Sequence, residues 1–74
     1  DVQVYPNPAK ESITIDPKDQ DVILNVFSIS GQLLVTKSIS TKSNHSLNGF
    51  APGIYIIHIH SSGESVSKKL IITQ

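Results

Sequence analysis

A run of strand-forming residues in the second half of the chain places the tightest limit on its fold. From Ile54 to Ile59 every residue is β-branched or aromatic except His58, and such residues favour β-strands. At a period of two, one face of this run is wholly apolar and carries Tyr55, Ile57 and Ile59, whereas the other face is apolar only at its start. Because edge strands usually carry charges or prolines, we expect this run to be a central strand of a sheet.

The two residues before this run predict how the chain enters it. Pro52 restricts φ and Gly53 permits a positive φ, which is the combination that a type II turn requires. We therefore expect a turn at Pro52-Gly53, and we attribute Gly53 to a backbone requirement.

The rest of the chain predicts short strands separated by turns. Ser30-Gly31 has the spacing of a two-residue hairpin, and Ser61-Ser62-Gly63-Glu64 predicts a second hairpin. Period-two patterning points Ile13 and Ile15 inward, and it indicates that both faces of residues 22–29 are buried. Besides the central run, the expected strands are residues 2–5, 12–15, 22–29, 32–39, 45–47 and 65–73.

Two further segments interrupt this pattern. Pro6-Asn7-Pro8-Ala9 lacks two backbone donors and predicts a rigid crossing between strands, and residues 16–21 form a polar loop. No window shows the helical period, and eleven Ile and six Val outnumber two Ala. The fold class that follows is all-β: a compact, seven-stranded antiparallel sandwich.

The length of the chain limits the number of domains, and its charge limits the kinds of partner that it can bind. At 74 residues the chain supports one domain, residues 1–74, with a small core and no cysteine to reinforce it. A net charge of zero, the absence of Arg and the few aromatics give no support to nucleic-acid binding. No apolar run is long enough to span a bilayer and no signal peptide begins the chain. Because the chain starts on a strand, we expect it to be excised from a longer protein.

The polar residues give weak indications of chemistry. His58 and His60 could hold a metal with His45, but the spacing supplies no further ligand, and an exposed strand end is the explanation that the sequence favours. The carboxylates Asp16, Asp19 and Asp21 lack the spacing of a calcium loop. Eleven serines occur without a Gly-x-Ser-x-Gly elbow. We therefore expect no metal, no cofactor and no catalytic residues.

Lys68 and Lys69 have two interpretations. They could form a basic patch that a partner recognises, or they could be edge lysines that prevent the last strand from pairing with another chain. The residues alone favour the second interpretation.

Four segments in order resemble a known family, and together they cover nearly the whole chain. They are Tyr5-Pro6-Asn7-Pro8-Ala9, Phe27-Ser28-Ile29-Ser30-Gly31-Gln32-Leu33, Leu47 through Pro52-Gly53-Ile54-Tyr55, and Lys68-Lys69-Leu70-Ile71-Ile72. This order and spacing resemble the type A C-terminal sorting domain of the bacterial type IX secretion system, the Por secretion tail family.

The resemblance implies an immunoglobulin-like β-sandwich that acts as a signal and has no enzymatic activity. The partners it implies are the outer-membrane type IX translocon, which reads the domain after export to the periplasm, and a surface sortase that removes it. The parent protein would then be attached at the cell surface or released. A dimer through an edge strand is a further expectation.

The resemblance also assigns residues to the family motifs. The motif residues are Pro6, Asn7, Pro8, Gly31, Gly53 and Tyr55, of which the two glycines and Tyr55 have structural explanations. The candidate recognition residues are Lys68, Lys69, Leu70, Ile71 and Ile72, because exposed backbone and charge on a terminal edge strand can be read by β-augmentation.

Two alternatives stay open at this point. The domain could be an immunoglobulin-like or fibronectin-like accessory module that binds carbohydrate or acts as a spacer, and adjacent, exposed Tyr5 and Phe50 would favour it. The parent protein could also be a component of the secretion machinery that carries the same kind of domain.

Overall fold

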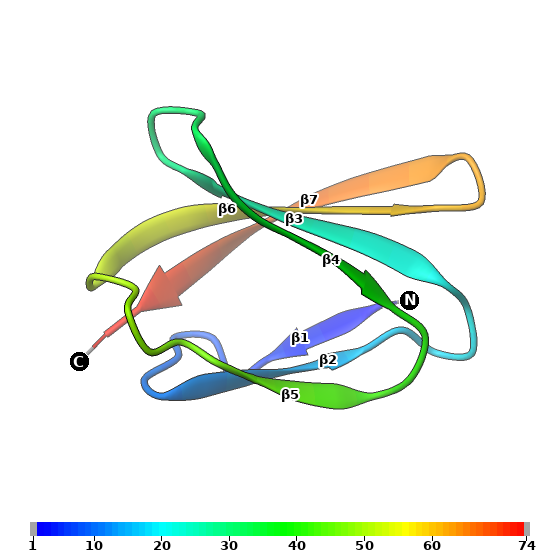
Figure 1. Ribbon diagram of the computed structural model, residues 1–74, viewed down its shortest axis with the longest axis horizontal. Coiled ribbons are helices and arrows are strands. Elements are labelled where there is room, and N and C mark those ends of the chain that lie inside the picture. The colour runs from blue at the N-terminus through cyan, green and yellow to red at the C-terminus, as the bar shows by residue number, and fades with distance from the viewer. Residues whose placement is uncertain (1, 74) are drawn as a thin grey trace.

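The computed structural model describes residues 2–73, which form two antiparallel sheets and no helix. The smaller sheet has the strand order β1-β2-β5 and the larger one β4-β3-β6-β7. Figure 1 shows the larger sheet above the smaller one, with the core between them. The strands are β1 (Gln3–Tyr5), β2 (Ser12–Asp16), β3 (Val22–Ser28), β4 (Leu33–Ile39), β5 (Ser43–Ser46), β6 (Gly53–Ser61) and β7 (Glu64–Ile72).

The predicted all-β sandwich is therefore confirmed, and β6 is a central strand as expected. It pairs with β3 on one side and with β7 on the other. Ile57 and Ile59 are buried and Tyr55 is half-buried against the core. Ile13 and Ile15 on β2 face them from the other sheet, as the period-two pattern predicted.

The outer face of β3 contradicts the expectation that both faces are buried. Val22, Leu24 and Val26 are buried between the sheets, but Ile23 is 45% exposed on the outer face. Ile29, which was assigned to the same strand, lies in the following turn and is 75% exposed. Residues 2–73 form two layers, and within them no third layer covers the outer face of the larger sheet.

The turn before β6 lies four residues earlier than predicted. The Phe50 amide donates to the Leu47 carbonyl at 3.0 Å, and Gly49 has φ +93° in the third position of that turn, as a type II turn requires. Gly53 has φ +155° and begins β6, so it is not the left-handed turn residue that we expected. Its extended backbone at positive φ is still a conformation that glycine adopts far more readily than other residues.

The two hairpins differ in their loops. The Gly31 amide donates to the Ser28 carbonyl at 2.9 Å, and the Ser28 amide donates to the Gln32 carbonyl at 2.9 Å. The loop therefore has three residues, with Gly31 at φ +94°, and the two-residue prediction was wrong. The hairpin at Ser62-Gly63 is confirmed; both residues have positive φ, which is typical of a type I′ turn.

The strand after β4 begins earlier than predicted. β5 covers Ser43–Ser46, whereas residues 45–47 were expected. The side-chain amide of Asn44 donates to the hydroxyls of Ser12 and Thr14 on β2 at 3.2 Å, which extends the contacts between the strands towards the start of β5. Leu47 is buried and belongs to the turn.

Tyr55 forms a contact that is typical of immunoglobulin-like sandwiches. Its hydroxyl donates to the backbone carbonyl of Ala51, four residues upstream, at the start of β6. The ring of Phe50 packs edge-on against the Tyr55 ring, with centroids 5.6 Å apart. This tyrosine corner fixes the crossing from β5 to β6. No helix of residues 2–73 is long and apolar enough to cross a membrane.

Candidate recognition site

The terminal strand β7 carries all five candidate recognition residues, but only part of it faces solvent. Leu70 and Ile72 are buried in the core. Ile71 is half-buried and Lys69 is exposed, both on the outer face. Leu70 and Ile72 therefore hold the fold together, and the side chains available to a partner are those of Lys69 and Ile71.

The free edge of β7 is already occupied over its last residues. The Asn7 side chain donates to the Lys69 carbonyl at 2.7 Å and accepts from the Ile71 amide at 3.0 Å. The buried Ala9 continues this pairing, because its amide donates to the Ile71 carbonyl at 2.8 Å and its carbonyl accepts from the Thr73 amide at 2.7 Å. The backbone that we expected to be exposed there is thus paired with the chain's own N-terminal segment.

This pairing explains the opening motif. Pro6 and Pro8 flank Asn7, and both of the peptide bonds preceding these prolines are cis. The segment lacks the amides of the two prolines, so its contacts with β7 come from the Asn7 side chain and the Ala9 backbone. Asn7 therefore has a structural role in the closure of an edge.

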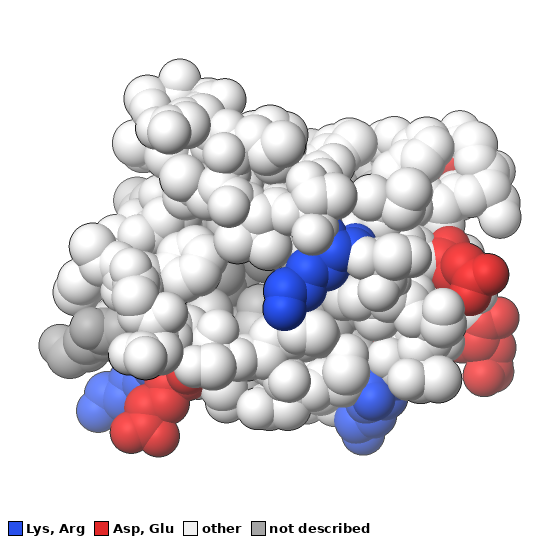
Figure 2. Space-filling view, in the orientation of Figure 1, with Lys and Arg blue, Asp and Glu red and all other residues white. Residues whose placement is uncertain are grey.

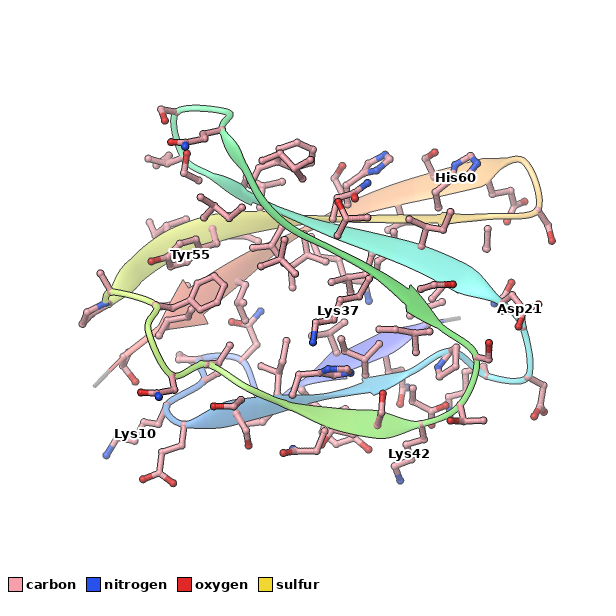
Figure 3. The ribbon with its side chains drawn as sticks, in the orientation of Figure 1. Lys10, Asp21, Lys37, Lys42, Tyr55 and His60 are labelled. Carbon is pink, nitrogen blue, oxygen red and sulfur yellow. The ribbon has the colours of Figure 1, made fainter. Side chains whose placement is uncertain are left out.

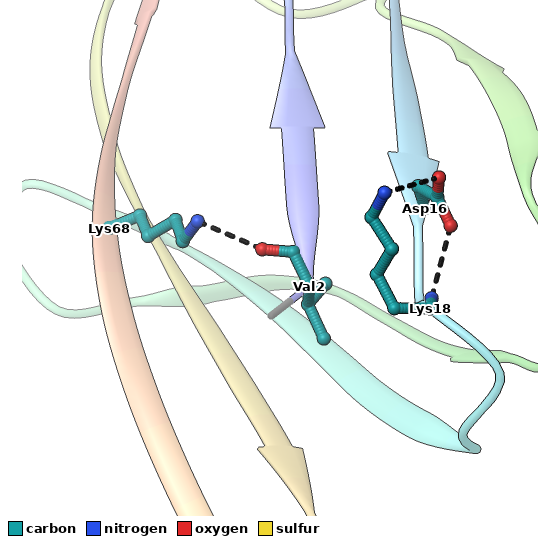
Figure 4. Close-up of polar contacts among 4 residues, drawn as sticks. All are labelled: Val2, Asp16, Lys18 and Lys68. Atoms are coloured by element: carbon teal, nitrogen blue, oxygen red, sulfur yellow. Dashed lines mark hydrogen bonds and ion pairs between the residues drawn. The ribbon is translucent and has the colours of Figure 1, made fainter.

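Lys68 also differs from the expectation. It is half-buried, and its Nζ donates to the Val2 carbonyl at 3.0 Å (Figure 4), which ties β7 to the segment leading into β1. The two lysines therefore have different roles: Lys68 joins the two sheets, and Lys69 projects into solvent.

The acidic loop makes a local contact of its own. Asp16 accepts from the Lys18 amide at 3.0 Å and lies 3.6 Å from the Lys18 ammonium (Figure 4). The backbone hydrogen bond, followed by the positive charges of Lys18 and Lys42, lowers the pKa of the Asp16 carboxyl. These contacts give Asp16 a structural role, which is to stabilise the turn that follows β2.

The three histidines lie in different places. His58 and His60 project from the outer face of β6, where His60 Nδ1 lies 3.0 Å from the Ser65 hydroxyl. His45 is on β5 in the other sheet, beside Ser43 and Lys37. In residues 2–73 no group of three or more His, Cys, Asp or Glu side chains is placed to hold a metal.

A second open region lies on the opposite side of the sandwich, between β4 and β5. β4 and β5 are edge strands of different sheets, and no backbone pairing joins them. Figure 2 shows a recess in the middle of this face, with a basic side chain beside it at the place that Figure 3 labels Lys37. We call this region the β4/β5 seam, defined by residues 35–39 and 43–47.

The seam contains a polar pair that the sequence analysis did not identify. Lys37 Nζ lies 3.5 Å from His45 Nδ1, and His45 Nε2 lies 2.8 Å from the Ser43 hydroxyl. Burial, and secondarily the charge of Lys37, lower the pKa of His45. Since a lysine ammonium can only donate, the neutral ring accepts from Lys37 and donates to Ser43. Alternation along β4 places Lys37 on the inward face with Val35 and Ile39, and this pattern in the sequence could have indicated the contact.

The aromatic residues do not form an exposed platform. Phe50 packs against Tyr55 and the core, whereas Tyr5 lies on β1 and is 40% exposed. The adjacency of exposed Tyr5 and Phe50 that would have favoured a carbohydrate site is not observed.

These features define an immunoglobulin-like β-sandwich module whose terminal strand is closed by its own N-terminal segment. The comparison with protein families is specific. The family described as secretion system C-terminal sorting domain matches residues 3–73, nearly the whole chain, and the chain belongs to this family. The resemblance to type IX sorting domains is thereby confirmed. A search of curated proteins found no match.

Proposed function

We propose that this domain is the signal by which the type IX translocon exports its parent protein across the outer membrane and delivers it to the cell surface. The domain passes through the periplasm in a folded state, and a surface sortase then removes it. The observation that carries the proposal is the family match over residues 3–73. The domain acts as a substrate of this machinery and not as a catalyst.

The exposed outer side of β7 is the part of the terminal motif that we propose the translocon contacts. Lys69 and Ile71 lie there next to each other on one face. We leave Lys68 out of this proposal because its ammonium donates to the Val2 carbonyl. A double substitution of both lysines would therefore combine a loss of stability with a loss of recognition.

The test is secretion of a reporter that carries an export signal upstream and residues 1–74 at its C-terminus. We expect the reporter at the surface or in the medium of a type IX-competent host, and in the periplasm of a translocon-deficient mutant. Equal surface delivery in both hosts, or retention in both, would contradict the proposal.

Single substitutions then separate the two lysines. Lys69→Ala is expected to fold with unchanged thermal stability and to reduce delivery, because its side chain is exposed. Lys68→Ala is expected to lower the thermal stability of the purified domain. Normal delivery of the Lys69→Ala reporter would exclude Lys69 from recognition while leaving the sorting function intact.

A further inference from the structure

The two outer edges of the larger sheet differ in how they are protected. The edge of β7 is paired with Asn7 and Ala9 over residues 69–73. The other edge is β4, which pairs with β3 on one side only. Near its start β4 has a register shift opposite Val26 and Phe27, and from Val35 to Ile39 the pairing is regular. Regular edge strands present a row of unpaired backbone groups that can template another strand.

An apolar cavity lies directly beside this edge. It has a volume of about 210 Å³ and lies between the sheets at the β4/β5 seam. Buried side chains from both sheets line it. The lining residues include Ile13, Val26, Val35, Leu47 and Phe50. A strand added to β4 would place every second side chain over this cavity.

The seam carries a charge without an opposite partner. In the part of the chain that the structure describes, the polar contact of Lys37 is with His45 Nδ1 at 3.5 Å, and no carboxylate pairs with it. His45 is held towards its neutral form by burial. Val35 and Ile39 flank Lys37 on the inward row of β4. The inward face of β4 therefore presents an apolar, a cationic and an apolar side chain in succession.

We propose that the seam binds an extended segment of a partner protein that adds to β4 as an additional strand. Its inward row would be apolar, acidic, apolar, so that its carboxylate lies opposite Lys37 and its apolar side chains cover the cavity. Cross-strand pairs of opposite charge are favourable, and pairs of like charge are unfavourable. The identity of the partner rests on the proposed function, because we expect the translocon to supply this segment. The binding chemistry of the seam does not depend on that function.

The same charge argues against a second copy of this chain as the occupant. Pairing of two β4 strands through their centres would bring two Lys37 ammonium groups to neighbouring positions on one face. An acidic strand from another protein removes this repulsion and supplies the missing counter-charge.

The test uses the isotope-labelled domain and a blocked seven-residue probe peptide, Thr-Val-Thr-Glu-Thr-Val-Thr, with a control peptide in which Lys replaces Glu. We expect the Glu peptide to shift NMR signals of residues 33–47 and to slow amide hydrogen exchange along β4. The Lys peptide should bind at least about fivefold more weakly. Lys37→Glu should reverse this preference, and Lys10→Glu, the same charge change at an exposed site outside the seam, should not.

Three outcomes would overturn the inference: no binding of either peptide, equal affinities for both, or signal changes confined to β7. Delivery of the Lys37→Glu reporter separates this inference from the sorting function. Wild-type delivery with loss in Lys37→Glu supports both. Wild-type delivery with normal delivery of Lys37→Glu rejects the seam as a second translocon contact, beside β7, and leaves the sorting function intact.

Discussion

At the scale of single residues, Asn7 has the clearest role. Its side chain satisfies one carbonyl and one amide of β7 that would otherwise face solvent at the sheet edge. An asparagine can do this because its amide group both donates and accepts, as a backbone peptide does.

We predict that Asn7→Ala destabilises the domain by about 1–2 kcal/mol, because two hydrogen bonds are lost. Chemical unfolding in urea measures this change. Asn44→Ala is the matched control, since its two bonds at 3.2 Å reach only surface hydroxyls, and we expect a change within about 0.5 kcal/mol. Equal losses in the two variants would contradict the closure of the edge by Asn7.

His45 makes the stability dependent on pH. Its pKa is lowered in the folded chain, so the unfolded chain takes up the proton more readily. This contribution to stability is complete above the unfolded pKa, about 6.5, and it is lost as the pH falls from there through the lower folded pKa.

We therefore predict that the free energy of unfolding falls between pH 7.5 and pH 5, and that His45→Gln reduces this fall. Removing the nearby charge with Lys37→Gln should also reduce it, by a smaller amount, because burial is the larger cause. Urea unfolding at three pH values measures both effects. An identical pH profile for His45→Gln and the wild type would show that the fall has another origin.

At the scale of elements, the entry into β6 depends on two glycines with different conformations. Gly49 has φ +93° in the turn and Gly53 has φ +155° at the start of the strand. No atom within 4 Å would meet an added Cβ at either position, so the cost of substitution comes from the backbone.

We predict that Gly49→Ala costs about 1–2 kcal/mol and that Gly53→Val costs roughly 1–3 kcal/mol, as measured by thermal and urea unfolding. A synthetic chain with D-alanine at position 49 should regain wild-type stability, because its allowed φ is positive. Equal stabilities of the L- and D-alanine chains would contradict the left-handed conformation of this residue.

The strands themselves were largely predictable from the sequence. Alternation assigned the inward residues of β2 and β6 correctly, because side chains of a strand must point to opposite faces. For β3 the two apolar rows led us to expect that both faces are buried, which was wrong for the outer face. Alternation could not show whether the outer face of β3 is covered, since that depends on the number of layers. The position of the turn before β6 was missed because both Gly49 and Gly53 suit a positive φ, and only the Leu47–Phe50 hydrogen bond distinguishes them.

At the scale of the whole molecule, the candidate site was less predictable than the strands. The contacts of β7 with Asn7 and Val2 join residues that are 62 to 66 positions apart in the chain. No local pattern indicates such a contact, so the terminal strand was expected to have a free edge. The β4/β5 seam was missed for the same reason, because it exists only where the last strands of two sheets lie next to each other.

We predict that deletion of residues 1–9 abolishes cooperative unfolding. The deletion removes β1, the buried Ala9 and the partners of β7, and so small a core has little stability to lose. Circular dichroism with urea titration measures this, and adding a peptide of residues 1–9 should restore part of the transition. A deletion variant with a wild-type transition would contradict the structural role of this segment.

The bridge between Ala9 and Ile72 is parallel, and this has a mechanical consequence. The start of β1 and the end of β7 lie towards opposite ends of the molecule (Figure 1), so tension between them would act along the direction in which these two segments run. The hydrogen bonds of Ala9 with Ile71 and Thr73 would then be loaded in shear, together and not one after another. A chain pulled from its N-terminal side would meet its greatest resistance at the place where its first residues are bonded to its last strand.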